Sequence, residues 1–443
     1  MTIRPTLADL RKNADFASLG REMHALATEL YPICRSITGE GLRRTLGILR
    51  QKAPLSIHEV PSQTPALDWT VPKEWNIRDA YVANARGERV IDFRKSNLHV
   101  VNYSAPIRAT MPLSELKGHL HSLPDRPDWI PYRTSYYQED WGFCLAHRDL
   151  ERLADGAYDV VIDSTLEDGS LSYGELLLPG ERSEEILLSC HACHPSLAND
   201  NLSGLSLVAL LARELANVSL RYSYRFLFVP GTIGSIVWLS RNEEAAARIR
   251  HGLVVACVGD AGALTYKRSR RGNAEIDRAA AHVVRGAAPA GTVVDFSPYG
   301  YDERQYCSPG FDLPVGSLTR TPHGRYPEYH TSADNLELLQ PDSLGDSLRA
   351  YLAVVAILEG NDRYRNTQPK GEPQLGKRGL YRAMGGFPDP GELQMAMLWV
   401  LNQSDGGPTL LDIADRAGLS FDTVRAAADR LVEHGLLVAS PPD

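Results

Sequence analysis

The sequence predicts an α/β sandwich with a mostly parallel sheet, a small β-rich domain inserted into it, and a C-terminal winged helix-turn-helix unit. Strands and helices alternate from about residue 171 to residue 360, which is the pattern of a parallel sheet. Residues 66–170 instead contain short alternating segments with little helical periodicity. Residues 388–443 indicate three helices followed by a strand. A chain of 443 residues is too long for one simple core, so several domains are expected.

The first part of the α/β domain precedes the insertion. Residues 15–52 carry apolar residues at helical spacing, broken into two pieces by Pro32 and Gly39. The segment LSIHEVPS that follows predicts a strand. We therefore assign residues 1–65 and 171–365 to one domain. In its second part the expected strands are YGELLLPG, EEILLSC, YRFLFVP and GLVVACVGD, and the helices between them include SGLSLVALLARELA.

The inserted domain and the C-terminal unit differ in composition and in residue pattern. Residues 66–170 are rich in tryptophan and tyrosine, and contain RVIDF, NLHVVNY and YDVVIDS as expected strands. Residues 366–387 are polar and rich in glycine, arginine and lysine, which predicts a linker. Residues 388–443 form the winged-helix unit, with SFDTVRAAADRLVEHG as its third helix and LLVAS as its strand.

Composition excludes several classes of function. The formal net charge is -8, which argues against a broadly basic nucleic-acid surface and against attraction to anionic membranes. No apolar run approaches the ~20 residues needed to span a bilayer, and the N-terminus lacks a signal-peptide core. Six cysteines are too few for a disulfide scaffold, so reduced thiols and a cytoplasmic location are expected.

The third helix of the winged unit does not have the charge of a DNA reader. Arg425 and Arg430 are opposed by Asp422, Asp429 and Glu433, so phosphates would be repelled as much as attracted. The sequence favours a packing, dimerisation or lid role over DNA binding, and a homo-oligomer is one expected assembly.

The stretch SCHACHPSLANDNLSG, residues 189–204, is the first candidate for a metal site. It follows an apolar strand and precedes an apolar helix. Pro195 cannot continue a central strand, so the strand should end at His194, at the sheet edge where ligands bind. His194 is therefore the first choice as a ligand. His191, three residues earlier, should point to the other face and is the weaker choice, and Asp200 could place a carboxylate over the same crevice.

Two further strand ends or loops offer ligands. Asp260 ends the apolar segment VVACVGD, where a buried carboxylate is costly unless it is paired or bound to a metal. His330 lies in PEYHTSADN, a loop of turn-forming residues, with Asp334 four residues on as a potential orienting partner. Each residue alone also fits a simpler role as a satisfied turn residue, and Asp200 with Asn201 could merely cap a helix.

The segment GYDERQYCSPGF, residues 300–311, is dense in polar and aromatic groups for a loop. Glu303, Arg304 and Tyr306 could face a substrate there, with Arg304 as a candidate to polarise a carbonyl; a surface salt bridge between Glu303 and Arg304 is the alternative. The residues expected to shape a substrate pocket are Tyr301, Tyr306, His323 and Tyr329.

The cysteines of the first stretch suggest two other chemistries. Cys190 and Cys193 have CxxC spacing. No second pair completes a structural zinc site, and a redox CxxC begins a helix, whereas this one lies in a strand. Strand packing is therefore the preferred interpretation.

Taken in order, a strand-end histidine, DNLSG, a strand-end aspartate and HTSAD resemble the co-catalytic zinc aminopeptidases, whose fold is an α/β/α sandwich. The resemblance implies that Asp200 bridges two Zn²⁺ ions, that His194 or His191 with Asp260 completes one ion, and that His330 binds the other. The chain is more similar still to bacterial proteins called aminopeptidase-like, which share CHPSLANDNLSG, PGTIGSI, YDERQYCSPG and YPEYHTSADN, an inserted β-rich domain and a C-terminal winged helix. This resemblance runs from about residue 20 to the end of the chain.

The chain departs from the zinc aminopeptidases at one place. That family carries a Glu-Glu pair, a general base and a metal ligand, where this sequence has about Pro230 and Gly231. Either one metal is lost or other residues substitute: Glu303 for the base, and the surplus imidazole of His191 or His194 for the ligand. The resulting hypothesis is a zinc-dependent hydrolase of a small peptide or amide, with one or two ions. A non-catalytic metal- or ligand-binding protein and a ligand-sensing regulator are the alternatives.

Overall fold

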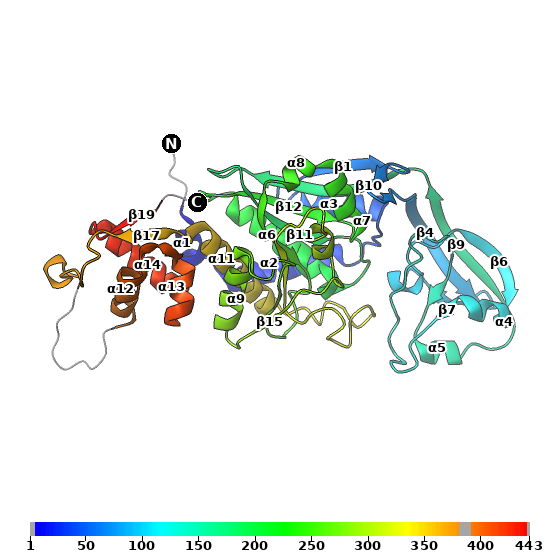
Figure 1. Cartoon of the computed structure of the whole chain (residues 1–443). Coiled ribbons are helices and arrows are strands. Elements are labelled where there is room, and N and C mark those ends of the chain that lie inside the picture. The colour runs from blue at the N-terminus through cyan, green and yellow to red at the C-terminus, as the bar shows by residue number, and fades with distance from the viewer. Residues whose placement is uncertain (1–4, 381–390, 441–443) are drawn as a thin grey trace.

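The computed structural model of the protein describes residues 5–380 and 391–440. Figure 1 shows three parts in a row, with the α/β domain in the middle, the β-rich insertion at one end and the winged helix at the other. The predicted class of fold is confirmed. Among the described residues, no helix combines the length and the apolar character that crossing a membrane requires.

A central sheet of eight strands organises the α/β domain. The strands are β1 (Ser56–Pro61), β10 (Ser170–Leu178), β11 (Glu185–His191), β12 (Ser223–Val229), β13 (Ile249–Val255), β14 (Thr265–Lys267), β15 (Thr292–Val294) and β16 (Val315–Thr319). Their spatial order is β1-β10-β12-β11-β13-β16-β14-β15. The four strands β12, β11, β13 and β16 are parallel, so their carboxyl ends meet at one edge. β1 and β10 are antiparallel to their neighbours and close one side of the sheet.

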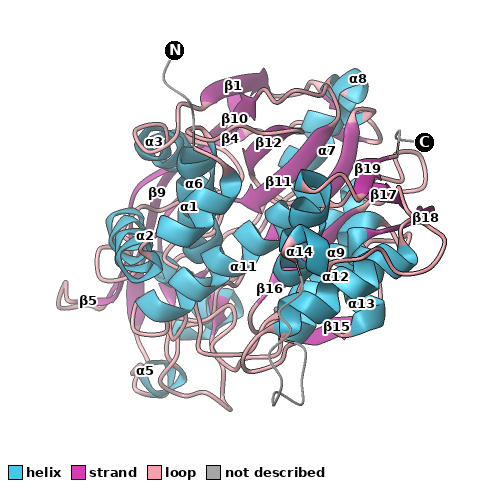
Figure 2. Ribbon diagram, turned by 90° about the vertical axis from the view of Figure 1, so that its left-hand side faces the viewer, coloured by secondary structure: helices cyan, strands magenta, loops and turns pink. Residues whose placement is uncertain are grey.

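Helices cover both faces of this sheet (Figure 2). They are α1 (Leu7–Asn13), α2 (Phe16–Leu30), α3 (Glu40–Leu49), α6 (Gly204–Leu215), α7 (Ile233–Arg241), α8 (Glu243–Ala246), α9 (Glu275–Gly286), α10 (Glu303–Tyr306) and α11 (Pro341–Gly360). Alternate residues of each strand serve the two faces. Leu188 of β11 packs in the core with α2, α6, α9 and α11, whereas Leu187 packs in the core with α7. Because both faces are buried, β11 and β12 are almost continuously apolar.

The insertion folds on its own antiparallel sheet. Its order is β5-β4-β9-β6, and a separate hydrophobic core lies beneath it. The elements of the insertion are β2 (Pro65–Ala66), β3 (Trp69–Thr70), β4 (Glu74–Ala83), β5 (Arg89–Asp92), η1 (Asn97–His99), β6 (Ile107–Pro112), α4 (Leu113–Leu116), η2 (Lys117–His119), β7 (Leu120–His121), β8 (Phe143–Cys144), α5 (His147–Glu151) and β9 (Ala157–Glu167). β9 leads directly into β10, so the insertion is joined to the central sheet at its antiparallel edge.

The winged helix begins earlier than the predicted boundary at residue 388. Its elements are β17 (Arg363–Asn366), η4 (Gly376–Arg378), α12 (Glu392–Gln403), β18 (Asp405–Thr409), α13 (Leu410–Ala417), α14 (Phe421–Glu433) and β19 (Leu437–Ala439). β17 is the middle strand of a three-stranded sheet with β18 and β19. The predicted boundary between the α/β domain and the linker, after residue 365, falls inside β17, because this short polar strand carries no strand periodicity. Part of the predicted linker, residues 381–390, lies outside the described residues, as do residues 441–443.

Candidate metal site

The strand that leads into the candidate site ends at His191. β11 pairs with β12 up to His191 and Val229, and the N–H of Ala192 still donates to the carbonyl of Val229. The prediction that the strand continues to His194 was wrong, and so was the prediction that His191 faces away. A turn begins before Pro195, so His191 is the residue at the carboxyl edge and His194 folds back toward it: His191 Nε2 and His194 Nδ1 are 3.1 Å apart.

Asp200 is placed by a short irregular helical segment, η3 (Ala198–Ser203), that precedes α6. The carboxylate of Asp334 fixes this segment by accepting hydrogen bonds from the backbone N–H groups of Asn199 (2.6 Å) and Asp200 (3.1 Å). Asp334 was predicted to orient His330, but its hydrogen bonds to the backbone of Asn199 and Asp200 position Asp200 instead. Burial raises the pKa of Asp334 to about 7.

Three imidazoles converge on the Asp200 carboxylate. His191 Nε2 lies 2.8 Å from Oδ1, and His330 Nε2 lies 3.0 Å from Oδ2. His194 Nδ1 lies 3.5 Å from the same Oδ2. Burial opposes ionisation of Asp200, yet the neighbouring histidines hold its pKa well below the usual range. The Asp200 and His191 side chains are 0% and 2% exposed, against 14% for His194 and 33% for His330, so solvent reaches the cluster from the side of His330.

The donor atoms fit a metal ion. His191, His194 and Asp200 each offer a ligand atom, and these atoms lie within 4.8 Å of one another. Zinc takes nitrogen and oxygen ligands at about 2.0–2.2 Å in a tetrahedron, so its donors lie roughly 3.3 Å apart. The shortest separations among these three side chains are 2.8 to 3.5 Å, with His191 measured to Oδ1 of Asp200 and His194 to Oδ2, and they are close to that spacing. This is the one such group of three or more in the parts of the chain that the structure describes, and His330 is not part of it.

Asp260 does not join the cluster. β13 ends at Val255, five residues before it, because the chain turns away from the sheet there. The Asp260 carboxylate accepts hydrogen bonds from Thr321 Oγ1 (2.6 Å), the N–H of Gly262 (2.7 Å) and Asn199 Nδ2 (3.0 Å). The expectation that a buried Asp260 needs a partner was correct, but the partners are loop donors, and its link to the site runs through Asn199.

Two of the four predicted pocket residues stack on the histidines. The Tyr301 ring stacks on His191 with centroids 4.9 Å apart, and the Tyr329 ring stacks on His330 at 3.9 Å. His323 contacts both tyrosine rings, at 4.9 and 6.2 Å. Tyr306 does not line the site, because its ring is fully buried in the core beside α7.

Glu303 is buried, not a surface residue. Its side chain is 1% exposed and Oε1 accepts from Lys267 Nζ at 2.7 Å, so the alternative of a surface ion pair with Arg304 was wrong. Oε2 of Glu303 and Nε of Arg304 are buried, and neither finds a hydrogen-bond partner among the described residues.

Sequence reasoning missed Asp302. This side chain is 0% exposed; Oδ1 accepts from Ser235 Oγ at 2.8 Å, and Oδ2 has no hydrogen-bond partner among the described residues. Burial raises the pKa of Asp302 to about 6. The signal was present in the polar segment YDERQY, but the sequence could not tell which of two adjacent carboxylates lies near Gly231.

Sequence reasoning also missed Tyr132, which comes from the insertion. Its ring meets the rings of His194 and His330 edge-on, with centroids 5.2 and 5.1 Å apart, and its N–H donates to the carbonyl of His330. The insertion therefore forms one wall of the candidate site, a contact that no local pattern could reveal.

The two cysteines of the CxxC motif are packing residues. Both are free and buried, and their Sγ atoms approach the backbone carbonyls of Leu227 and Gly231 at 3.7 and 3.8 Å. Burial raises the pKa of Cys193 to about 12 and that of Cys190 well above its usual value. Thiols in this state are poor nucleophiles, which agrees with the preference against a redox role.

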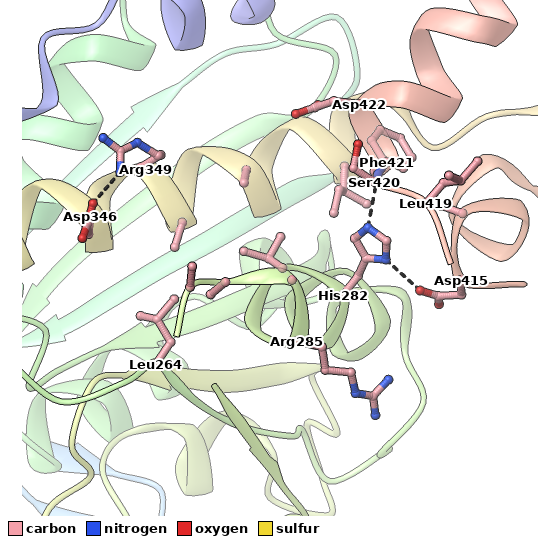
Figure 3. A pocket seen from close by; sticks show the side chains of 18 of the residues that line it. Leu264, His282, Arg285, Asp346, Arg349, Asp415, Leu419, Ser420, Phe421 and Asp422 are labelled. Atoms are coloured by element: carbon pink, nitrogen blue, oxygen red, sulfur yellow. Dashed lines mark hydrogen bonds and ion pairs between the residues drawn. The ribbon is translucent and has the colours of Figure 1, made fainter. Parts of the chain in front are cut away.

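A separate hollow of about 790 Å³ lies between α9, α11 and the winged helix, and the residues that line it do not include His191, His194, Asp200 or His330. Figure 3 shows His282 of α9 pointing at the start of α14 and at Asp415. The N–H of Phe421 donates to His282 Nε2 at 3.2 Å, and Nδ1 lies 2.7 Å from Asp415. The hollow therefore belongs to the junction between the domains, not to the metal site.

Comparison with known proteins identifies the class. A zinc aminopeptidase from Bacillus subtilis superposes with a TM-score of 0.57 at 13% identity, over 76% of this chain and 95% of that one. At this identity the likeness shows the fold alone. The fold and the His-His-Asp cluster together define an aminopeptidase-like α/β protein, and the resemblance inferred from the sequence motifs is confirmed.

Two relatives from Clostridium acetobutylicum are far more similar. One is known from a crystal structure, and its name suggests a peptidase. It superposes on this chain with a TM-score of 0.92 at 52% identity, over 96% of this chain and 98% of that one. A protein whose name proposes polysaccharide biosynthesis and an aminopeptidase-like domain is 54% identical over 418 residues, 94% of this chain and 96% of its own. Residues 24–361 match the family described as a domain of unknown function, DUF4910, and residues 362–439 match a winged helix-turn-helix family. The chain belongs to the DUF4910 family.

Proposed function

We propose that this protein is a metal-dependent hydrolase of amide bonds. The observation that carries the proposal is the convergence of His191, His194 and Asp200 at the carboxyl edge of the sheet, on the fold that zinc aminopeptidases share. Ligands bind at that edge in open α/β sheets. A partly exposed cluster of imidazoles around one buried carboxylate fits a zinc ion better than it fits a structural role.

His191, His194 and Asp200 would hold the ion, and His330 would lie beside the second oxygen of Asp200. When bound, a zinc ion supplies positive charge that polarises a carbonyl oxygen and lowers the pKa of a water molecule. The remaining work falls to the protein. Asp334 fixes the position of Asp200 through two backbone hydrogen bonds, and Tyr301 and Tyr329 hold the imidazole planes by stacking.

The walls of the site favour a small substrate. Tyr132, Tyr301 and Tyr329 surround the histidines, and the opening lies on the side of His330. Flat amide groups and sugar rings both pack well on such faces. The name of the Clostridium acetobutylicum relative, which proposes polysaccharide biosynthesis, supports a small amide as much as a peptide. The sequence proposed Arg304 for the carbonyl and Glu303 for the attacking water; of these two roles, the one for Arg304 is kept here as a prediction.

In this proposal the winged helix packs against the α/β domain and supports it. The start of α14, which in DNA-binding relatives of the motif enters the major groove, is bonded to the α/β domain instead. Asp422 pairs with Arg11 at 2.7 Å, and the N–H of Phe421 donates to His282. We infer that the unit steadies α9 and α11 and does not bind nucleic acid.

One observation favours a second candidate function, a metal- or ligand-binding protein without catalysis. Pro230 and Gly231 supply no side-chain carboxylate where the zinc aminopeptidases have two. A hydrolase therefore requires that another group of this chain takes the proton, whereas a binding protein requires none.

The test combines metal analysis with hydrolysis. Protein purified without chelators is measured for metal by mass spectrometry and assayed with aminoacyl-p-nitroanilides and N-acetylated amino sugars. A hydrolase retains zinc, turns over at least one of these amides, and loses turnover on removal of the metal and on Asp200→Asn. Zinc binding without turnover of either class supports the binding protein. Absence of metal affinity contradicts the hydrolase and the metal-binding protein.

A further inference from the structure

The turn between β12 and α7 leaves a space that a neighbouring segment fills. A Cβ atom placed on Gly231 would lie 3.0 Å from Cβ of His191 and 3.5 Å from Oδ2 of Asp302. The first distance is tighter than an ordinary contact, so His191 would have to shift by a few tenths of an ångström to admit a side chain at residue 231. The second shows that the carboxylate of Asp302 stands where a side chain at residue 231 would extend. The space beside Gly231, which has no side chain of its own, is therefore occupied by Asp302 from the 300–306 segment.

Among the described residues, one oxygen of the Asp302 carboxylate has a hydrogen-bond partner and the other has none. Ser235, in the first turn of α7, donates to Oδ1 at 2.8 Å. Oδ2 is buried and has no partner among the described residues. Leaving a buried carboxylate oxygen unpaired is unfavourable. A protein retains such a group where it binds something that the folded chain alone does not supply.

The adjacent carboxylate of Glu303 also has one buried oxygen, Oε2, without a hydrogen-bond partner among the described residues, but its other oxygen is bound to a cation. Its Oε1 lies 2.7 Å from the Lys267 ammonium, which is itself largely buried. The ion pair holds Oε1 of Glu303 toward Lys267, so this oxygen is already engaged. Among the described residues, the Asp302 carboxylate accepts from one neutral hydroxyl, that of Ser235. Oδ2 of Asp302 and the His191 side chain both lie beside Gly231, whereas Glu303 lies beside Lys267 and Gly300.

We propose that Asp302, not Glu303, is the proton acceptor of the reaction, in place of the Glu-Glu pair that the chain lacks. The inference rests on the proposed function. As the oxygen of water bonds to the amide carbon, one O–H bond breaks and its proton passes to Oδ2 of Asp302. As the C–N bond breaks, the same proton passes to the leaving nitrogen. An acid and an amine are released, and Asp302 returns to its ionised form.

The experiment compares Asp302→Asn and Glu303→Gln in the full chain, with Asp277→Asn as a matched control. Asp277 is a buried carboxylate whose oxygens are satisfied by Tyr266, Ser269 and Ala274, away from the histidines. Three quantities are measured for each variant: amide hydrolysis, zinc content and the melting temperature.

For Asp302→Asn we expect a loss of kcat of at least ~100-fold, the size of a general-base contribution. Zinc content should equal that of the unmodified protein, and the melting temperature of the metal-free variant should not fall, because an unpaired carboxylate is replaced by a neutral amide of the same shape. Asp302→Glu should recover part of the rate. Asp277→Asn should instead lower the melting temperature and leave kcat unchanged.

Other outcomes distinguish failure of the inference about Asp302 from failure of the proposed function. If Asp302→Asn keeps the rate while Glu303→Gln loses it, Glu303 is the base and the inference is overturned. If Asp302→Asn loses zinc together with activity, Asp302 is a ligand, which also overturns it. If the unmodified protein binds zinc and hydrolyses no amide of either class, the proposed function fails and the inference with it.

Discussion

His330 Nε2 lies 3.0 Å from Oδ2 of Asp200, on the oxygen that His191 does not approach. In the resemblance to the two-ion aminopeptidases this pair would belong to a second metal. No further carboxylate or thiol joins the pair to form a three-ligand group among the described residues. The relationship between these two residues therefore bears directly on how many ions the protein holds.

We expect one zinc ion per chain. A second ion would have only Asp200 and His330 as protein ligands, because Pro230 and Gly231 contribute none, and catalytic zinc sites use three. Mass spectrometry of the purified protein should give one equivalent. His191→Ala should abolish zinc binding, whereas His330→Ala should retain the ion with reduced affinity. Two equivalents in the unmodified protein would show that another residue completes the second site.

Asp334 should control metal affinity without touching the metal. Its carboxylate accepts hydrogen bonds from the N–H groups of Asn199 and Asp200, so Asp334→Asn replaces one acceptor oxygen by a donor. Groups that orient a ligand typically change metal affinity by roughly 10–100-fold. Competition with a fluorescent zinc chelator measures this change. Asp260→Asn is the control, because Asp260 bonds to the Asn199 side chain and not to the backbone of Asp200; an equal loss of affinity in both variants would contradict a specific role for Asp334.

A buried histidine away from the site should make the fold sensitive to acid. Burial, with the nearby charges of Arg250 and Arg221, lowers the pKa of His251 to about 4, from about 6.5 in the unfolded chain. A histidine with a depressed pKa contributes stability that is present above pH 6.5 and is lost as the pH falls toward 4. The full effect is of the order of 3 kcal/mol.

The variant His251→Phe removes this titration and keeps a ring beside Tyr222. Urea denaturation at pH 7.5 and pH 5 should show that the free energy of unfolding falls less with acid in the variant than in the unmodified protein. His434→Phe, at an exposed position, serves as the control. Equal acid sensitivity in all three proteins would assign the effect to other groups.

The sequence predicted the larger features of this molecule because they depend on local pattern. The continuous apolar strands, the helices between them and the shift to short alternating segments in the insertion can all be recognised from the periodicity of apolar residues. The end of β11 was misplaced by three residues because Pro195 limits a strand but does not define where its pairing stops. Asp260 was assigned to the cluster because the loop after β13 offers no sign of how far it turns away.

Two groups at the site could not be predicted because they depend on long-range packing. Asp302 reaches Gly231 across about seventy residues of sequence, and Tyr132 reaches His330 from another domain. Their neighbours are fixed only when the sheet has assembled. The polar segment YDERQY indicated a site, but whether Asp302 or Glu303 faces it was decided by Ser235 and Lys267, which lie on other elements.

The winged helix should not bind DNA, and its docking should depend on His282. A gel-shift assay at low salt, the condition that favours binding to phosphates, should show no complex with random-sequence duplex DNA. His282→Ala removes the acceptor of the Phe421 N–H and the partner of Asp415, and should lower stability by about 1–2 kcal/mol. His434→Ala, exposed at the end of α14, should not. A retarded DNA band that disappears at higher salt would contradict the packing role.

Tyr132 should set the size of substrate that the site accepts. Its hydroxyl bonds to that of Tyr136 at 3.0 Å, and its ring meets the rings of His194 and His330 edge-on. Tyr132→Phe keeps the ring and should leave kcat/KM within about 3-fold of the unmodified protein. Tyr132→Ala removes a wall, and the loss of about 0.5–1.5 kcal/mol of ring contact should raise KM for small amides by roughly 3–10-fold.

The same opening should help bulkier substrates. With Tyr132→Ala, the ratio of kcat/KM for a dipeptide amide to that for a single aminoacyl amide should rise, because the insertion no longer restricts the side of the site that faces solvent at His330. Zinc content should stay at the level of the unmodified protein, since Tyr132 offers no ligand to the cluster of His191, His194 and Asp200. If Tyr132→Ala lowers kcat/KM equally for both substrates and leaves their ratio unchanged, then the insertion supports the histidines without selecting what reaches them.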